Sequence, residues 1–175
     1  SLDELMQVLN QRHATVFVHP NMHQTSEELQ LTTPGFILEF LCDTTRAAVN
    51  LITTGVIEKY PNINWILAHA GGFLPYVAWR VSLCNLMPEL TEKTPQGFLH
   101  YIQRFYFDTA LSPSPYAMAA LKQLVDPSHI LFGSDFPFAP KQLSILQKQN
   151  LDELAVFTDE ERQNLLRANS LALFP

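Results

Sequence analysis

The sequence predicts an α/β fold in which parallel strands alternate with helices. Two observations predict it: four short runs rich in branched or aromatic residues, and helical patterns that separate them. The apolar stretches of the runs are nearly continuous, as in strands that are buried on both faces. Alternation of strands and helices indicates βαβ units and therefore a parallel sheet. The predicted strand runs are Ala14–His19, Ile63–His69, Arg104–Asp108 and Ile130–Asp135.

The helices are predicted from apolar spacing and from their first residues. The segment Pro34–Tyr60 carries apolar residues at intervals of three to four and is expected to break at Gly55. Proline favours the first turn of a helix, and Thr158-Asp-Glu-Glu161 forms a capping-box pattern for a last helix that runs to about Asn169. The other predicted helices are Pro75–Leu86, Pro95–Ile102, Ser114–Leu124 and Pro140–Gln149. The loop Asn21–Thr33 is long and polar, and such loops are often functional.

Composition narrows the class of protein. The 175 residues include 17 Asp and Glu against 11 Lys and Arg, a net charge of −6 without a basic cluster, which disfavours nucleic-acid binding. A hydrophobic fraction of 47% with 16% charged residues excludes disorder. Apolar runs are too short to span a bilayer, and no secretory signal opens the chain. Two cysteines, Cys42 and Cys84, fit buried thiols in a reducing compartment, so we expect a single-domain cytoplasmic protein.

Each predicted strand run ends in a residue that can bind a metal or transfer a proton. These residues are His19, His69, Asp108 and Asp135. In parallel α/β folds, ligands and catalytic groups gather at the carboxyl ends of the strands. A strand-end Asp can instead cap the next helix, and a strand-end His can simply bond to backbone. The occurrence at all four strand ends favours a shared site.

The residue types indicate a divalent metal site. Two imidazoles and a carboxylate are suitable ligands for Zn²⁺ or a similar ion, and the two glycines after His69 permit close approach of the backbone. Three other histidines, His13, His100 and His129, are expected to be structural or exposed. The sequence contains no Gly-x-Ser-x-Gly, P-loop or Gly-x-Gly-x-x-Gly motif.

Four motifs together resemble the amidohydrolase-related metal-dependent decarboxylases, a family that includes aminocarboxymuconate semialdehyde decarboxylase. They are Phe17-Val-His-Pro20, Ile66-Leu-Ala-His-Ala-Gly-Gly72, Phe107-Asp-Thr-Ala110 and Leu131-Phe-Gly-Ser-Asp-Phe-Pro137, in the order found in that family. The resemblance extends over nearly the whole chain. It implies a (β/α)₈ TIM barrel, of which these motifs resemble strands five to eight.

The resemblance also implies roles for individual residues. His19 corresponds to the strand-five metal ligand and Asp135 to the strand-eight ligand. His69 matches a histidine that lies beside the metal and moves protons. Arg80 matches an arginine that reaches into a neighbouring subunit's site and holds a substrate carboxylate. For Asp108 no ligand role carries over, and a buried structural role is equally expected.

The chain departs from the family in one respect. The family's first two metal ligands form a His-x-His pair, which this sequence lacks. A full barrel takes about 250 residues. We therefore expect residues 1–175 to form one domain, the C-terminal half of a barrel, with the N-terminal half absent. Such a half would expose sheet edges and an apolar face, which predicts pairing with another copy or chain, most simply as a homodimer.

Three functions remain open from the sequence. The first is metal-dependent decarboxylation of an aromatic or muconate-type carboxylic acid, a carbon–carbon lyase reaction with a divalent ion, expected to be Zn²⁺. The second is hydrolysis of a lactone or another ester-like bond on the same scaffold, because the two reactions differ in the pocket rather than in the ligands. The third is a non-catalytic fragment or assembly subunit, because two ligands hold Zn²⁺ weakly.

Overall fold

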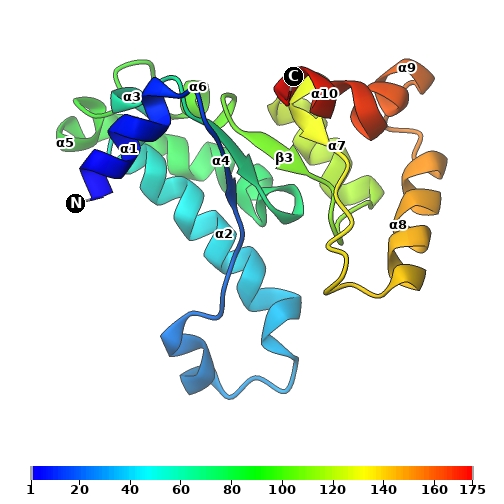
Figure 1. Cartoon of the computed structure of the whole chain (residues 1–175). Helices are drawn as coiled ribbons and strands as arrows, with labels where there is room; N and C mark the ends of the chain where they lie inside the picture. The colour runs from blue at the N-terminus through cyan, green and yellow to red at the C-terminus, as the bar shows by residue number, and fades with distance from the viewer. Residues whose placement is uncertain (1, 175) are drawn as a thin grey trace.

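A computed structural model of the chain describes residues 2–174 and has the predicted α/β architecture (Figure 1). Its sheet contains four parallel strands that are neighbours in chain order, β1-β2-β3-β4. Each crossover between neighbouring strands carries helices, as a parallel sheet requires. The strands are β1 (Thr15–Val18), β2 (Asn64–Leu67), β3 (Tyr106–Asp108) and β4 (Ile130–Leu131).

The strands are shorter than the predicted runs, but their carboxyl ends lie side by side. Val18 pairs with Leu67, Leu67 with Phe107, and Asp108 with Leu131. The chain after β2 and the chain after β4 both pass through left-handed backbone, at His69 and at Asp135. The polar ends of the predicted runs therefore stand at one edge of the sheet.

Helices follow the strands largely as predicted. The long first segment breaks at Gly55 (φ 78°), and Ser114 caps its helix by accepting the N–H of Ala117. The helix after Met87 was not predicted, and the last two predicted helices extend further than expected. The α-helices are α1 (Leu2–Gln11), α2 (Gly35–Thr53), α3 (Val56–Lys59), α4 (Leu74–Ser82), α5 (Pro88–Thr91), α6 (Phe98–Ile102), α7 (Pro115–Leu124), α8 (Lys141–Glu153), α9 (Asp159–Gln163) and α10 (Asn169–Leu173).

Short helical turns complete the chain. The 3₁₀ turns are η1 (Gln24–Leu29), η2 (His69–Gly71), η3 (Leu83–Leu86) and η4 (Pro127–His129), and a π-helical turn, η5 (Asn164–Ala168), joins α9 to α10. The capping box predicted at the start of the last helix is present: Thr158 accepts the N–H of Glu161, whose side chain accepts the N–H of Thr158. The last helical segment thus begins where the sequence predicted.

The hydrophobic core lies between one face of the sheet and the helices that cover it. Alternate strand residues such as Leu67 and Phe107 point into this layer and are fully buried. Helices α2, α4 and α7 contribute Ile52, Leu74 and Met118 to the same cluster. Burial of these side chains is the main favourable term for the fold.

The opposite face of the sheet is less covered than the apolar runs predicted. Phe17, in the middle of β1, is 49% exposed, although its strand neighbours Val16 and Val18 pack against the core. The prediction of strands buried on both faces is therefore wrong for β1. Neither predicted thiol is fully buried: Cys42 and Cys84 are free and partly exposed. Within residues 2–174, no helix is both long and apolar enough to cross a bilayer.

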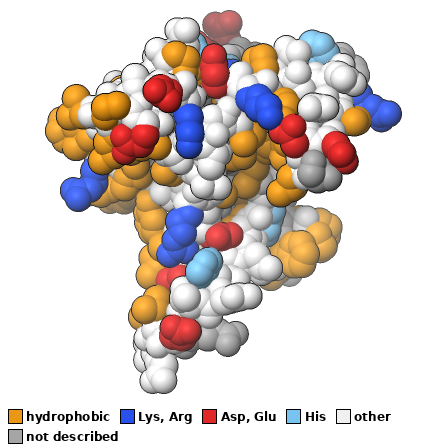
Figure 2. All heavy atoms as spheres, turned by 90° about the vertical axis from the view of Figure 1, so that its left-hand side faces the viewer, with side chains coloured by type: hydrophobic (Ala, Val, Ile, Leu, Met, Phe, Trp, Pro, Cys, Tyr) orange, Lys and Arg blue, Asp and Glu red, His pale blue; other side chains and the backbone are white. Residues whose placement is uncertain are grey.

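The predicted polar loop and the first turns of α2 project from the body of the molecule (Figures 1 and 2). Two hydrogen bonds fasten the loop to α2: the hydroxyl of Ser26 donates to the buried carboxylate of Glu39 (2.7 Å), and the N–H of Asn21 donates to Asp43 (2.9 Å). The segment that follows His19 is thereby held in one path.

The C-terminal helices are tied directly to the last strand. The N–H of Phe132 donates to the carbonyl of Leu165 in the π-helical turn (3.0 Å). The side-chain amide of Asn169, which is buried, donates to the carbonyls of Pro127 and Ile130 (2.9 and 2.8 Å). These bonds hold β4 where it can present the residues that follow it.

We predict that Asn169→Ala lowers the free energy of unfolding by about 1–3 kcal/mol, because the buried carbonyl of Ile130 and the partly buried carbonyl of Pro127 each lose a hydrogen bond from the amide. Urea denaturation followed by circular dichroism measures the change. Asn164→Ala, at an exposed position in the neighbouring π-helical turn, is the matched control and should change stability by less than about 0.5 kcal/mol. Equal destabilisation by both variants would contradict the prediction.

Candidate metal centre

Three of the four strand-end residues meet at the carboxyl edge of the sheet. One potential ligand atom from each of His19, His69 and Asp135 lies within 4.8 Å of the others. Nε2 of His19 is 3.7 Å from Oδ1 of Asp135, and the rings of His19 and His69 meet edge to face with centroids 5.5 Å apart. Residues from the first, second and last strands therefore share one site.

His19 has one ring nitrogen fixed by the backbone. Its Nδ1 lies 2.9 Å from the carbonyl of Pro20, which can only accept, so Nδ1 carries the proton. In the neutral ring Nε2 is then the acceptor atom, and it faces Asp135. A hydrogen bond from the other ring nitrogen to the backbone selects the tautomer of a metal-binding histidine.

His69 is buried on a left-handed turn that follows β2. His69 and Ala70 both have φ near 55°, which is uncommon for residues with a side chain. Burial lowers the pKa of the imidazole below its ordinary range, the nearby Asp135 carboxylate opposes this shift, and His19 adds to it. The ring is thus favoured in its neutral form, which can accept a proton or donate electrons to a cation.

Two glycines let this turn approach its neighbours. A Cβ on Gly71 would lie 2.7 Å from the ring of Phe107, and a Cβ on Gly72 would lie 2.2 Å from the carbonyl oxygen of Leu41 in α2. The hydroxyl of Thr45 accepts the N–H of Phe73 just beyond the turn (2.8 Å). Close packing on both sides explains why two glycines follow the histidine.

Asp135 lies in the loop between β4 and α8, also in left-handed backbone (φ 59°). The buried side chain of Gln147 in α8 fastens this loop: its amide donates to the carbonyl of Ser134 (3.1 Å), and its oxygen accepts the N–H of Leu111 (2.5 Å). Gln147 was not predicted, because a polar residue within an amphipathic helix gives no signal of burial. It links the loops that follow β3 and β4.

Asp108, the fourth strand-end residue, lies beneath this cluster. Its Oδ1 accepts the backbone N–H groups of His69 (2.8 Å) and Ala110 (3.0 Å). Burial raises the pKa of the carboxyl group to about 6 and Asp135 adds to the rise, whereas the two N–H groups and His19 lower it. Asp108 borders the same pocket but does not belong to the three-residue cluster.

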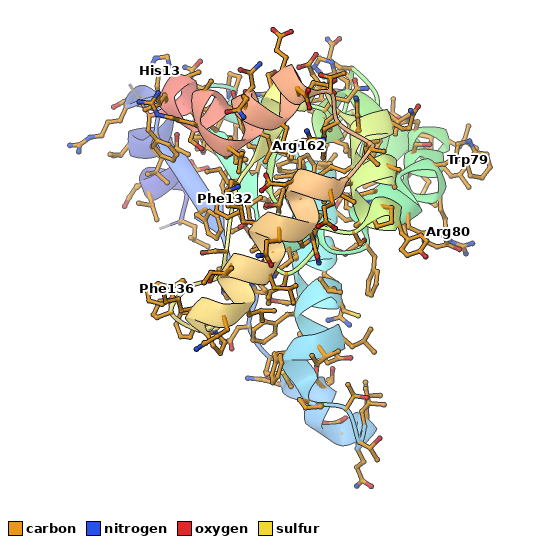
Figure 3. All side chains as sticks on the ribbon, turned by 90° about the vertical axis from the view of Figure 1, so that its right-hand side faces the viewer. His13, Trp79, Arg80, Phe132, Phe136 and Arg162 are labelled. Atoms are coloured by element: carbon orange, nitrogen blue, oxygen red, sulfur yellow. The ribbon has the colours of Figure 1, made fainter. Side chains whose placement is uncertain are left out.

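The cluster lies in a pocket of about 570 Å³ with aromatic walls. One wall is the open sheet face, with Phe17 and Leu131, and another is the loop after β4, with Phe136, which is labelled in Figure 3. Ser170 and Phe174 close it from the C-terminal segment and were not predicted. The pocket combines an apolar surface with a few convergent polar groups, as small-molecule sites do.

Arg80 is not part of this pocket. In Figure 3 it points outward with Trp79 from α4, at the edge of the molecule opposite Phe136. The three histidines expected to be structural or exposed are so: His13 and His100 are exposed, and His129 stacks on Tyr106 and bonds to the carbonyl of Phe105 (2.9 Å). The structure thus joins His19, His69 and Asp135 and separates Arg80 from them.

The sequence profile described as Amidohydrolase matches residues 1–175, and the chain belongs to this family. It is 36% identical to a 6-methylsalicylic acid decarboxylase of Penicillium expansum over 168 residues, which are 95% of this chain and 52% of that protein. It is 26% identical to a 2-amino-3-carboxymuconate-6-semialdehyde decarboxylase of Dictyostelium discoideum over 160 residues, 90% of this chain and 44% of that one. The chain therefore spans about half the length of these relatives.

Solved structures show the same relation. An amidohydrolase crystal structure superposes with a TM-score of 0.88 at 30% identity, over 98% of this chain and 55% of the other. A dihydroxybenzoic acid decarboxylase from Polaromonas, solved with manganese and 2-nitroresorcinol, superposes with a TM-score of 0.80 at 22% identity over 98% and 52%. The four-stranded α/β unit thus corresponds to about half of these folds.

We predict that Gly72→Ala lowers the free energy of unfolding by about 3 kcal/mol or more, because the new methyl group meets the α2 backbone and the residue has a positive φ. Gly97→Ala is the matched control: its φ is also positive, but the nearest atom would be 3.5 Å away, so only the conformational cost of about 1–3 kcal/mol applies, and the loss should be smaller than at Gly72. Thermal and urea denaturation compare the two, and equal losses would contradict the role of α2 contact.

Proposed function

We propose that this chain supplies strands five to eight of the barrel and part of the metal centre of a metal-dependent decarboxylase that acts on an aromatic carboxylic acid. The observation that carries the proposal is the meeting of His19, His69 and Asp135 in one aromatic-walled pocket. The names of the relatives support the reaction: 6-methylsalicylic acid, aminocarboxymuconate semialdehyde and γ-resorcylate decarboxylases.

The donor set fits a divalent cation. His19 bonds to the carbonyl of Pro20 through Nδ1 and directs Nε2 toward the carboxylate of Asp135, 3.7 Å away. Nδ1 of buried His69 has no hydrogen-bond partner within the described residues. We propose His19 and Asp135 as ligands of a divalent cation. Zn²⁺ suits such donors, and manganese in the Polaromonas structure makes Mn²⁺ the other candidate. The cation, when bound, would supply Lewis acidity toward substrate oxygens.

His69 is proposed as the proton-transfer residue. Its imidazole is buried, which lowers its pKa and favours the neutral form, and the ring borders both the proposed cation ligands and the aromatic wall of the pocket. Loss of CO₂ from an aromatic ring requires a proton at the carbon that carried the carboxylate. An imidazole with a pKa at or below neutrality exchanges such a proton readily.

Arg80 is proposed to bind a substrate carboxylate in a neighbouring copy, within a homodimer. Its position outside the pocket of its own chain excludes a role there. It stands beside an exposed apolar surface on α4 and η3, in which Tyr76 is 88% and Trp79 73% exposed. An exposed apolar surface of this kind typically forms a protein–protein contact.

The metal centre is tested by calorimetric titration of the purified chain with Zn²⁺ and Mn²⁺. We expect one site, with affinity reduced about tenfold or more in His19→Ala and Asp135→Asn, because each removes a ligand. His13→Ala, an exposed histidine outside the pocket, is the matched control. Wild-type affinity in both ligand variants would refute the site.

Activity is tested with the same preparations. The chain is assayed alone and after co-expression with the N-terminal half of the Penicillium expansum relative, using CO₂ release from 6-methylsalicylate and 2,6-dihydroxybenzoate and hydrolysis of aromatic lactones. We expect the co-expressed halves to release CO₂, and we expect His69→Ala to abolish this release. Lactone hydrolysis would favour the hydrolase, and metal binding without turnover would favour the non-catalytic subunit.

We further predict that the chain is a dimer at micromolar concentration and that Trp79→Glu converts it to a monomer, because a charge would be buried in the contact. Light scattering coupled to gel filtration measures this. Leu171→Glu places the same charge at an exposed apolar position on α10 and should leave the dimer intact. A monomeric wild-type chain would contradict the α4 contact.

A further inference from the structure

The carboxylate of Asp108 accepts a hydrogen bond that a backbone carbonyl of β3 would accept if the ladder continued. Ladder pairing of β2 with β3 ends at Leu67 and Phe107. The next N–H on β2, that of Ala68, turns to β1 and donates to the carbonyl of Val18 (3.2 Å). Since successive N–H groups of a strand point to opposite sides, that of His69 points toward β3. There it meets Oδ1 of Asp108 (2.8 Å) in place of a backbone carbonyl.

This bond holds a turn that would not be stable by itself. His69 and Ala70 both adopt left-handed backbone, at a cost on the order of 1–3 kcal/mol each. Such conformations persist only where surrounding contacts determine them. Oδ1 of Asp108 also accepts the N–H of Ala110, so one buried oxygen joins the turn after β2 to the loop after β3.

The ring of His69 lacks a comparable hydrogen bond. Its Nδ1 is buried and has no partner within the described residues, in contrast with His19, whose Nδ1 bonds to Pro20. The direction of the His69 ring therefore depends on its backbone and on packing. The backbone, in turn, depends on Asp108.

Gly133 provides the space for this carboxylate. A Cβ at Gly133 would lie 2.9 Å from Cβ, Cγ and Oδ2 of Asp108. The N–H of Gly133 donates to the hydroxyl of Thr109 (3.2 Å), which keeps the loop after β4 against Asp108. Gly133 thus leaves room beside β4 for the carboxylate of Asp108 at the end of β3.

We propose that Asp108 is a positioning residue: it orients the imidazole of His69 in the pocket by holding the backbone of its turn. The inference rests on the proposed function of His69, which it deepens. An amide oxygen can accept the same two N–H groups, so Asp108→Asn should retain the role. Asp108→Ala removes the acceptor and should lose it.

The test uses the complete chain labelled with ¹⁵N, with His69→Gln identifying the ring and amide signals of His69. In Asp108→Ala we expect displaced or broadened ring signals and amide exchange at His69 faster by about tenfold or more, as for loss of a hydrogen bond to a charged group. Asp108→Asn should resemble the wild type. Asp126→Ala, which removes a carboxylate bonded to the N–H of Ser128 outside the pocket, is the matched control and should leave His69 unchanged.

A folded Asp108→Ala with wild-type His69 signals would overturn the proposal. If that variant does not fold, Gly133→Ala decides: it keeps the carboxylate but displaces it, and unchanged His69 signals would equally overturn the proposal. In the co-expressed enzyme, Asp108→Ala should lower kcat about tenfold with KM nearly unchanged, and Asn should restore it. The spectra are recorded without turnover. An inactive wild-type enzyme would therefore refute the proposed function, but the His69 signals would still decide the role of Asp108.

Discussion

Parallel pairing of four short strands is the constraint on which the rest of the molecule depends. Because the strands run parallel, every strand ends at the same edge of the sheet. Because neighbours in the sheet are also neighbours in the chain, each loop that leaves that edge begins beside the next loop along the chain. Histidine after the first strand can therefore meet aspartate from the loop after the last, although 116 positions of sequence separate residues 19 and 135. The same pairing divides the sheet into a face covered by helices and a face that carries the pocket.

Much of the site could be inferred from sequence because strand ends are recognisable. His19 and Asp135 each follow a run of branched and aromatic residues, and parallel topology requires those ends to converge. The helix boundaries at Gly55 and Thr158 were equally predictable, since each rests on a local rule about left-handed backbone or capping.

What could not be inferred depends on contacts between distant segments. Gln147 is a polar residue on a helix, and only the folded chain shows that it is buried between two loops. Ser170 and Phe174 reach the pocket because the C-terminal segment folds back over it. Exposure of Phe17 was missed for the opposite reason: its apolar run predicts burial on both faces, and nothing in residues 2–174 covers the pocket face of β1 completely.

The π-helical turn between α9 and α10 sets the rotation of everything that follows it. A π turn accommodates one residue more than an α-helical turn, and each helical residue rotates the chain by about 100°. If Asn164–Ala168 kept all its residues but took regular α-helical geometry, the extra residue would no longer be absorbed, and Asn169 and Ser170 would turn about the helix axis by about that angle. The amide of Asn169 would then leave the carbonyls of Pro127 and Ile130. The π turn therefore keeps the C-terminal wall of the pocket in register with β4.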